Sequence, residues 1–210
     1  MKLTTTTQVS VDGVMQANGP SEEERRAGFE RDGWAIGHFD SEAMTWVEQT
    51  CQGADAFLFG RRTYNMFAPY WGAMEPGSGP IADALNTKPK YVASNTLTGP
   101  HWANTVAVLS GDLAAAIGEL KAKPGGELQV HGSGALTRWL LENDLVDEIN
   151  LLIVPVVVGQ GTRLFPADGP DMALDLIESR AFPQGVTLQV YRPVGRPHYV
   201  LAAPNPGHVT

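Results

Sequence analysis

The chain alternates between short apolar runs and segments in which apolar residues recur at helical spacing. The runs are rich in Val, Thr, Leu and Phe, which predicts strands. The helical segments follow the N-cap candidates Asp40 and Asp112, or glycines that end a run. Strands are predicted at 3–11, 54–59, 90–94, 105–109, 127–131 and 148–158, with a hairpin of 174–179 and 186–191, and helices at 41–52, 63–70, 113–121 and 135–143.

This alternation predicts an α/β domain with a mostly parallel sheet and an antiparallel C-terminal end. Asp12-Gly13 predicts a turn after the first strand, and Ser21 with Glu24 has the capping-box pattern of a short helix inside a polar loop. Pro155 predicts a bulge or an edge position in the strand at 148–158. Prolines accumulate from residue 193 onward, so we expect a domain at 1–193 and an extended tail at 194–210.

Composition and charge exclude several classes of protein. The 210 residues are 43% hydrophobic and 18% charged, which is typical of one folded domain and not of a disordered chain. A net charge of -8, with 15 Lys and Arg residues spread along the chain, disfavours nucleic acid as a partner. The single cysteine, Cys51, excludes a disulfide within the chain and a Cys-based zinc site, and the histidines lack metal-ligand spacing. No signal peptide or membrane span is evident, so a cytoplasmic protein is expected.

The segment after the second predicted strand has chemistry suited to a phosphate. Gly60 would let a ligand approach the backbone, and the helix behind it offers free N–H groups and the positive end of its dipole. Arg61 and Arg62 add bidentate charged donors. The alternative is structural: Gly60 forms a turn, Thr63 caps the helix and both arginines are surface charges. This segment alone leaves both interpretations open.

A second glycine turn, Gly132-Ser133-Gly134, joins a predicted strand to a helix. Backbone N–H groups from 132 to 136 could hold a pyrophosphate, although a purely structural turn is the alternative. Thr137 stands where the last glycine of the dinucleotide fingerprint would be, and the acidic residue expected about 20 residues later is missing. A Rossmann-type or flavin-type oxidoreductase is therefore disfavoured.

Ser94 and Asn95 end a third strand and could bind a ribose phosphate, but alone they are better explained by a plain turn. The three strand ends together favour a nucleotide site, because each carries phosphate-compatible groups without a nucleophile or metal ligands.

The same residues carry a family resemblance. The chain resembles the dihydrofolate reductase-like superfamily, and most closely the branch of the C-terminal reductase domain of riboflavin biosynthesis. The resemblance covers residues 1–193. It rests on the order of Val9-Ser10-Val11-Asp12-Gly13, Gly33-Trp34, the segments 59–64, 132–134, 140–148 and 155–161, Leu164-Phe165, and Gly185-Val186 leading to Tyr191.

The resemblance implies a three-layer sandwich around an eight-stranded, mainly parallel sheet, with NADPH across the strand ends and a homodimer as the assembly. It assigns the cofactor phosphates, with the 2′-phosphate side, to Gly60, Arg61, Arg62 and Thr63, and places Ser94 and Asn95 by the adenosine phosphate. It assigns the pyrophosphate to Gly132, Ser133, Gly134, Ala135 and Leu136, and counts Val130 among the cofactor-binding residues. It places Gln8, Asp12 and Met15 beside the nicotinamide and the substrate, and Trp34 beside the substrate.

Two departures leave the substrate open. His131 stands where riboflavin reductase domains usually carry Glu. Asp40 and Glu42 are the only candidates for the acid of a folate pocket, and Asp40 is better explained as a helix cap. We expect an NADPH-dependent reductase of a small pterin- or pyrimidinone-like heterocycle, with Asp12 or Glu42 holding the water that supplies a proton. The alternative is a non-catalytic nucleotide-binding module of the same fold.

Overall fold

The computed structural model describes residues 1–19, 24–25 and 27–200. Ser21, the expected start of a short helix, lies outside the described residues. The elements are β1 (Lys2–Ser10), α2 (Ser41–Gly53), β2 (Ala54–Gly60), α3 (Arg61–Trp71), α4 (Pro80–Thr87), β3 (Lys90–Ala93), β4 (Thr105–Leu109), α5 (Leu113–Ala122), β5 (Glu127–His131), α6 (Gly134–Glu142), β6 (Glu148–Val154), β7 (Leu174–Ala181) and β8 (Thr187–Pro193).

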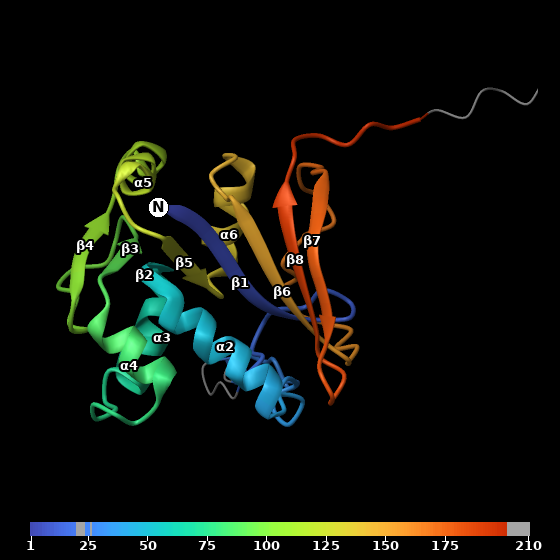
Figure 1. The fold of residues 1–210 in the computed structure, drawn as a ribbon, viewed down its shortest axis with the longest axis horizontal. Coiled ribbons are helices and arrows are strands. Elements are labelled where there is room, and N and C mark those ends of the chain that lie inside the picture. Colours follow the sequence, from blue (N-terminus) through green and yellow to red (C-terminus); the bar gives the residue numbers. More distant parts are fainter. Residues whose placement is uncertain (20–23, 26, 201–210) are drawn as a thin grey trace, which may run out of the picture.

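The strands form one eight-stranded sheet in the order β4-β3-β2-β5-β1-β6-β8-β7 (Figure 1). Neighbours from β4 to β6 are parallel, and β8 is antiparallel to both β6 and β7. This arrangement confirms the predicted mainly parallel sheet with an antiparallel C-terminal hairpin.

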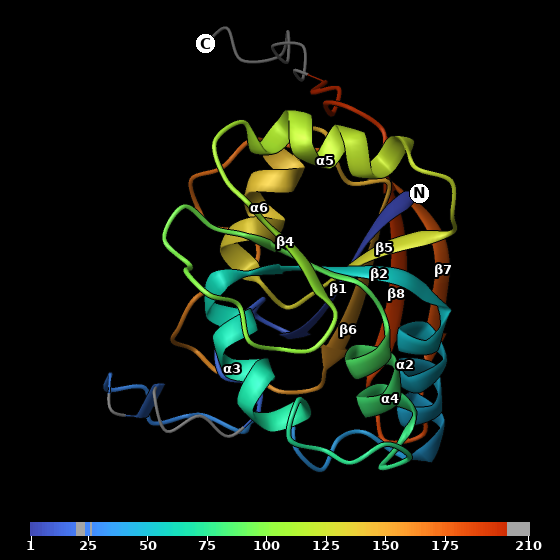
Figure 2. The same ribbon diagram turned by 90° about the vertical axis from the view of Figure 1, so that its left-hand side faces the viewer.

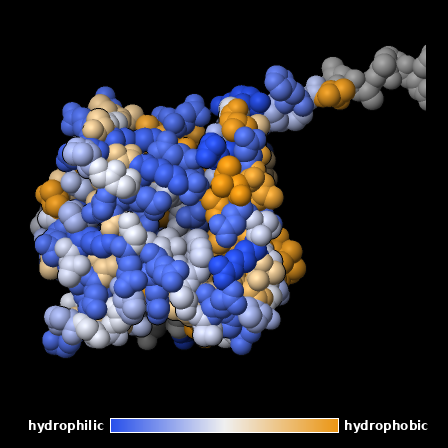
Figure 3. Space-filling model, in the orientation of Figure 1, coloured by the Kyte–Doolittle hydropathy of each residue, from blue (hydrophilic) through white to orange (hydrophobic). Residues whose placement is uncertain are grey.

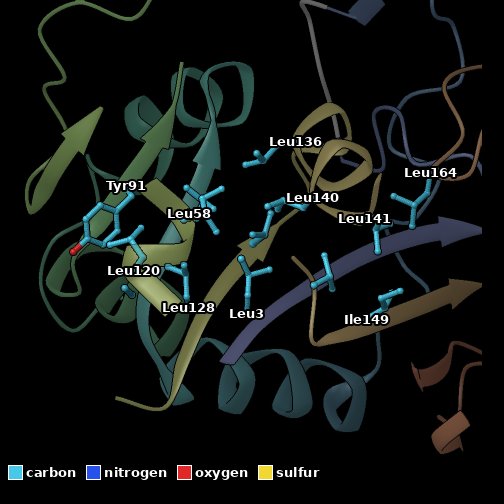
Figure 4. Close-up of a cluster of buried hydrophobic side chains, with 14 of the residues drawn as sticks. Leu3, Leu58, Tyr91, Leu120, Leu128, Leu136, Leu140, Leu141, Ile149 and Leu164 are labelled. Atoms are coloured by element: carbon cyan, nitrogen blue, oxygen red, sulfur yellow. The ribbon is translucent and has the colours of Figure 1, made fainter. Parts of the chain in front are cut away.

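Helices cover both faces of the sheet and make the expected three layers (Figure 2). Leu58 points to the face that α5 and α6 cover, whereas Phe57 and Phe59 point to the face that α2, α3 and α4 cover. Full burial of such a side chain contributes roughly 1.5–3 kcal/mol. Figure 4 shows the core on the α5–α6 face, where Leu128 and Leu140 are completely buried.

Most elements match the sequence prediction to within about two residues, and helix α3, helix α4 and strand β6 show the main differences. Helix α3 begins at Arg61, not Thr63, because Gly60 takes the N-cap position with an extended backbone. Helix α4, which was not predicted, follows Gly79 with Pro80 in its first turn. Strand β6 ends at Val154 rather than at residue 158, because Pro155 has no N–H to donate to the ladder and the chain turns away after it.

The C-terminal boundary stays a prediction. Strand β8 ends at Pro193, and Val194 N–H donates to the carbonyl of Ala173 at 2.9 Å. Farther along, the hydroxyl of Tyr199 donates to Asp171 Oδ2 at 2.8 Å. No helix of the described residues combines the length and apolar character that crossing a membrane requires.

Candidate functional site

The three phosphate-compatible segments lie side by side at the carboxyl edge of the sheet. Gly60 at the end of β2 is in register with Ala93 of β3, which precedes Ser94. On the other side, β5 lies between β2 and β1, and its last residue His131 is in register with Thr6. Parallel pairing therefore brings residues 60–63, 94–95 and 132–136 to one edge, as the site prediction requires.

A direct hydrogen bond joins the two glycine segments. The N–H of Gly60 donates to Oγ of Ser133 at 3.1 Å. Ser133 adopts a left-handed backbone with φ 50°, after Gly132 with φ 60°, and such a serine costs on the order of 1 kcal/mol. This turn aims the serine hydroxyl at the end of the neighbouring strand.

The bond leaves the first turns of α3 and α6 open to an anion. Gly60 is the N-cap of α3 and Ser133 the N-cap of α6, and neither side chain caps its own helix. The hydroxyl of Ser133 instead accepts the hydrogen bond from the N–H of Gly60, the N-cap residue of α3. A Cβ at Gly132 would meet no heavy atom within 4 Å, so there is open space beside the turn. Two adjacent helix N-termini with free N–H groups suit a pyrophosphate.

Other predicted cofactor residues contribute in different ways. Val130 is completely buried and Leu136 is 8% exposed, so both support the turn from within the core. Oγ of Ser94 accepts from the N–H of Leu97 at 2.9 Å, and Oδ1 of Asn95 accepts from Gly111 N–H at 3.2 Å. The Ser94 contact is that of a plain turn, whereas the Asn95 contact joins the loop after β3 to the loop after β4.

The segment after β1 packs against the second glycine turn. A Cβ on Gly134 would come within 2.4 Å of Sδ of Met15, so the sulfur lies directly on this glycine. Gln8, on β1, accepts a hydrogen bond at 3.0 Å from the amide of Asn18. Trp34 donates its indole N–H to the carbonyl of Gln16 at 2.8 Å and is half-buried. Met15, Gln8 and Trp34 are thus brought to one neighbourhood.

Asp12 fastens the turn after β1 to the segment after β6. Its carboxylate accepts from the N–H of Val158 at 3.0 Å, from the N–H of Gly159 at 2.9 Å and from the hydroxyl of Ser10 at 2.7 Å. Nε of Arg163 donates to the carbonyl of Asp12 at 2.8 Å. The Ser10 hydrogen bond, followed by those from the two amides, holds the pKa of Asp12 far below its usual value. This geometry favours a role in ordering the loop over direct donation of a proton.

Glu42 lies away from the glycine turns. It is in the first turn of α2 and pairs with Arg180 of β7. Strand β7 is the edge strand at the antiparallel end of the sheet, so β8, β6 and β1 separate Arg180 from β5. Asp40 caps α2 through the N–H groups of Glu42 and Ala43, both at 2.9 Å. The Ala43 amide contributes most to lowering the pKa of Asp40. The cap interpretation of Asp40 is confirmed.

The two arginines of α3 have different environments. Arg62 pairs with Glu24, a carboxylate that is 8% exposed. Arg61 is exposed and makes no hydrogen bond or ion pair within the described part of the chain. Nothing in the sequence alone distinguishes these two neighbouring arginines.

Comparison with known proteins places the chain in a family. The family model of the RibD C-terminal domain matches residues 1–188. The chain belongs to the RibD C-terminal domain family. This membership indicates a reductase related to riboflavin biosynthesis.

Similar proteins agree with this assignment. An uncharacterized protein of Bacillus subtilis, YyaP, is 28% identical over 139 residues, which are 65% of this chain and 73% of that protein. A putative riboflavin biosynthesis protein from Shewanella sp. PV-4 has a TM-score of 0.66 at 22% identity, over 92% of this chain and 99% of that one. A pyrimidine reductase-like protein from Corynebacterium diphtheriae has a TM-score of 0.58 at 13% identity, over 92% of both chains. These structures share the dihydrofolate reductase-like fold.

His131 ends strand β5, and Gln129 holds its imidazole in place. The amide of Gln129 donates to the carbonyl of Thr50 and to Oε2 of Glu127, both at 2.8 Å, which fixes its Oε1 toward His131 Nε2 at 2.9 Å. Since Oε1 only accepts, Nε2 carries the proton. Burial lowers the pKa of His131 to about 4, so the imidazole is neutral at pH 7.

Cys51 lies beside this histidine, with Sγ 4.0 Å from Nε2. It is 3% exposed, and burial raises the pKa of its thiol to about 12. The interpretation of Cys51 as a small buried residue is confirmed.

Several residues around the site carried no signal in the sequence. Gln16, Glu24 and Arg163 each join segments that are distant along the chain. Gln16 and Arg163 belong to no motif with fixed spacing, and Glu24 belongs only to the capping-box pattern with Ser21, which does not indicate its contact with Arg62. The polar character of residues 17–33 indicates a loop around Glu24 and says nothing of Arg163.

Proposed function

We propose that this protein is an NADPH-dependent reductase that transfers a hydride to a C=N or C=O carbon of a small pterin- or pyrimidinone-like heterocycle. The observation that carries the proposal is the hydrogen bond from Gly60 to Ser133, because it sets two uncapped helix N-termini beside each other at the strand ends. Family membership supports the reductase class.

The residues at this edge fit a dinucleotide with an extra phosphate. The first-turn N–H groups of α3 belong to Arg61, Arg62 and Thr63, and those of α6 belong to Gly134, Ala135 and Leu136. Arg61 is exposed and has no partner among the described residues, so its guanidinium is available to pair with the 2′-phosphate. The open space beside Gly132 leaves room for the pyrophosphate. The bound cofactor would supply the hydride, and the chain would bind and orient it.

The proton that the substrate takes up must come from a group other than Asp12 or His131. Asp12 stays ionised because its carboxylate accepts from backbone amides and Ser10, and His131 is neutral with its one N–H committed to Gln129. We propose that water delivers the proton and that Asp12 orders the loop that holds this water. Glu42 remains the alternative acid, at a greater distance from the glycine turns.

Binding and turnover test the proposal separately. Calorimetric titration of the full chain with NADPH and NADH at one ionic strength should show tighter binding of NADPH. Consumption of NADPH should then appear with at least one member of a pterin and pyrimidinone panel. Equal affinity for both nucleotides, or no binding of either, would overturn the cofactor assignment.

A non-catalytic nucleotide-binding module of the same fold is the second candidate. The observation that favours it is the absence of an available proton donor at Asp12 and His131. Tight NADPH binding without turnover of any panel member would support this candidate.

A homodimer and a cytoplasmic location complete the proposal. Leu176 and Ile177 on the edge strand β7 are 56% and 47% exposed, and apolar residues gather on the β7–β8 side of the surface in Figure 3. An exposed apolar edge strand is a natural site for pairing with a second copy. Analytical ultracentrifugation of the wild type and of Ile177→Lys measures the oligomeric state. We expect a wild-type dimer that Ile177→Lys weakens, and a monomeric wild type would contradict the proposal.

A further inference from the structure

An ion pair connects Glu24 to the first turn of α3. Oε1 of Glu24 accepts from the guanidinium of Arg62. The residue Glu24 is 8% exposed, whereas the side chain of Arg62 is 63% exposed. A carboxylate this deep needs charged or hydrogen-bonded partners to remain in the folded state. The contact therefore differs from the exposed ion pairs that contribute little.

Gln16 extends this contact to the segment after β6. Its Nε2 donates to Oε2 of Glu24 at 2.6 Å, so both carboxylate oxygens have donors. Its Oε1 accepts from the N–H of Thr162 at 2.8 Å and from the Thr162 hydroxyl at 3.2 Å. A continuous series of polar contacts thus runs from Thr162 through Gln16 and Glu24 to Arg62.

This series of polar contacts borders the candidate site at Arg62 and at Gln16. Arg62 is in the first turn of α3, two residues after the N-cap Gly60. Gln16 follows Met15, whose sulfur lies on Gly134, and the carbonyl of Gln16 holds the indole of Trp34. A fixed Glu24 therefore fixes the segment that borders the proposed nicotinamide and substrate positions.

This series of polar contacts gives Arg61 and Arg62 different roles. A guanidinium already matched by a nearly buried carboxylate is a poor ligand for a phosphate, because the phosphate must displace or share that partner. Arg61 has no such partner in the described part of the chain.

We propose that Glu24 is a positioning residue: it fastens the segment after β1 to α3 through Gln16 and Arg62. Arg62 is committed to this contact, and Arg61 supplies the ion pair to the 2′-phosphate of the cofactor. The positioning role of Glu24 involves only contacts within the protein. The different roles of Arg61 and Arg62 rest on the proposed NADPH function.

Hydrogen exchange of the ligand-free protein tests the fastening. Peptides covering 14–19 and 27–34 should exchange about tenfold faster in Glu24→Gln and in Arg62→Ala, which removes an exposed side chain and leaves the core intact. Arg62→Lys, which keeps the charge, should restore part of the protection. Glu30→Gln is the matched control, since Glu30 is exposed and without a partner in the described residues. Unchanged exchange in Arg62→Ala would overturn the fastening.

Titrations with NADPH and NADH test the division of the arginines. Arg61→Ala should reduce the preference for NADPH over NADH by about tenfold, whereas Arg62→Ala and Glu24→Gln should change both affinities by the same factor. Loss of the preference in Arg62→Ala, with Arg61→Ala unchanged, would overturn it. If the wild type binds neither nucleotide, the proposed function and this division fail together, and the exchange experiment still decides the fastening.

Discussion

Gly60 and Ser133, 73 residues apart in the sequence, meet through a hydrogen bond from the glycine N–H to the serine Oγ at 3.1 Å. The N-cap residues of two helices are thereby joined, and each N-terminus keeps its remaining amides for a ligand. Gly60 itself has φ -74°, a conformation open to any residue. Its lack of a side chain is therefore a matter of space and not of backbone strain.

Gly60→Ala tests the space between the two helix N-termini. The new Cβ would lie 3.6 Å from Cβ of Leu136 and 3.7 Å from Cβ of Ser133, which is ordinary contact, so the fold should persist. A methyl group at this place should weaken NADPH binding by about tenfold or more, because it enters the space proposed for a phosphate. Calorimetry measures the affinity and circular dichroism the fold.

Gly118→Ala is the matched control for this variant. Gly118 lies within α5, where a Cβ meets nothing within 4 Å, so the substitution should stabilise the helix by roughly 0.5–1 kcal/mol and leave binding unchanged. Normal NADPH affinity in Gly60→Ala would show that this glycine serves packing only.

His131 should behave as a neutral residue throughout the physiological range. Burial lowers its pKa to about 4 from 6.5, so the folded state binds fewer protons than the unfolded state. The stability of the fold should fall as the pH drops from 6.5 toward 4, relative to His131→Asn. Nitrogen NMR of the imidazole should find the Nε2–H tautomer at pH 7; titration near pH 6.5 would contradict this.

The sheet was predictable because local patterns determine it. Phe57, Leu58 and Phe59 alternate between two covered faces, and Asp40 marks the start of α2 by a cap that spans three residues. Helix α4 escaped prediction because its eight residues are too few to show a period, although Pro80 follows Gly79 at its start.

The site was predictable only where its requirement is local. Glycines 132 and 134 were visible because a tight turn and the close approach of Met15 demand them. The partners of Asp12 are amides 146 and 147 residues away, and the contact between Glu24 and Arg62 also depends on the finished fold. No spacing rule encodes such pairs.

The buried amine of Lys90 should make the free energy of unfolding increase as the pH rises from 8 to 10.5. Its side chain is completely buried, donates to the carbonyls of Leu85 and Lys88 at 2.6 and 2.9 Å, and has its pKa lowered by burial from 10.5 to about 8. The cost of the buried charge is complete below pH 8 and disappears as the pH rises toward 10.5. Relative to Lys90→Met, wild-type stability should rise by about 3 kcal/mol over that interval.

Urea unfolding of both proteins at pH 7, 9 and 10.5 measures this difference, since other titrating groups are common to the two. The methionine variant leaves the two carbonyls without their donor, which lowers its stability equally at every pH. Parallel pH dependence of the two proteins would contradict the predicted shift in the pKa of Lys90.

Asp12→Asn should slow turnover without removing the cofactor. The carboxylate accepts from the amides of Val158 and Gly159, and an asparagine can offer only one oxygen, so one amide should lose its partner. The loop that carries Met15 should then lose its fixed place. We expect kcat to fall by about tenfold, a barrier change of roughly 1.4 kcal/mol, while NADPH affinity stays within about twofold.

The pH profile separates ordering by Asp12 from proton transfer. Its hydrogen bonds hold the pKa of Asp12 far below the usual range, so the wild-type group stays ionised through the whole accessible interval. A positioning role therefore leaves the shape of the kcat profile between pH 5 and 8 the same in Asp12→Asn. Loss of an ionisation from that profile, with a fall in kcat of about 10² or more, would instead show that Asp12 takes part in the proton step. Arg163→Ala, which removes the donor to the Asp12 carbonyl but no acid, should reproduce the milder effect if ordering of this loop limits the rate.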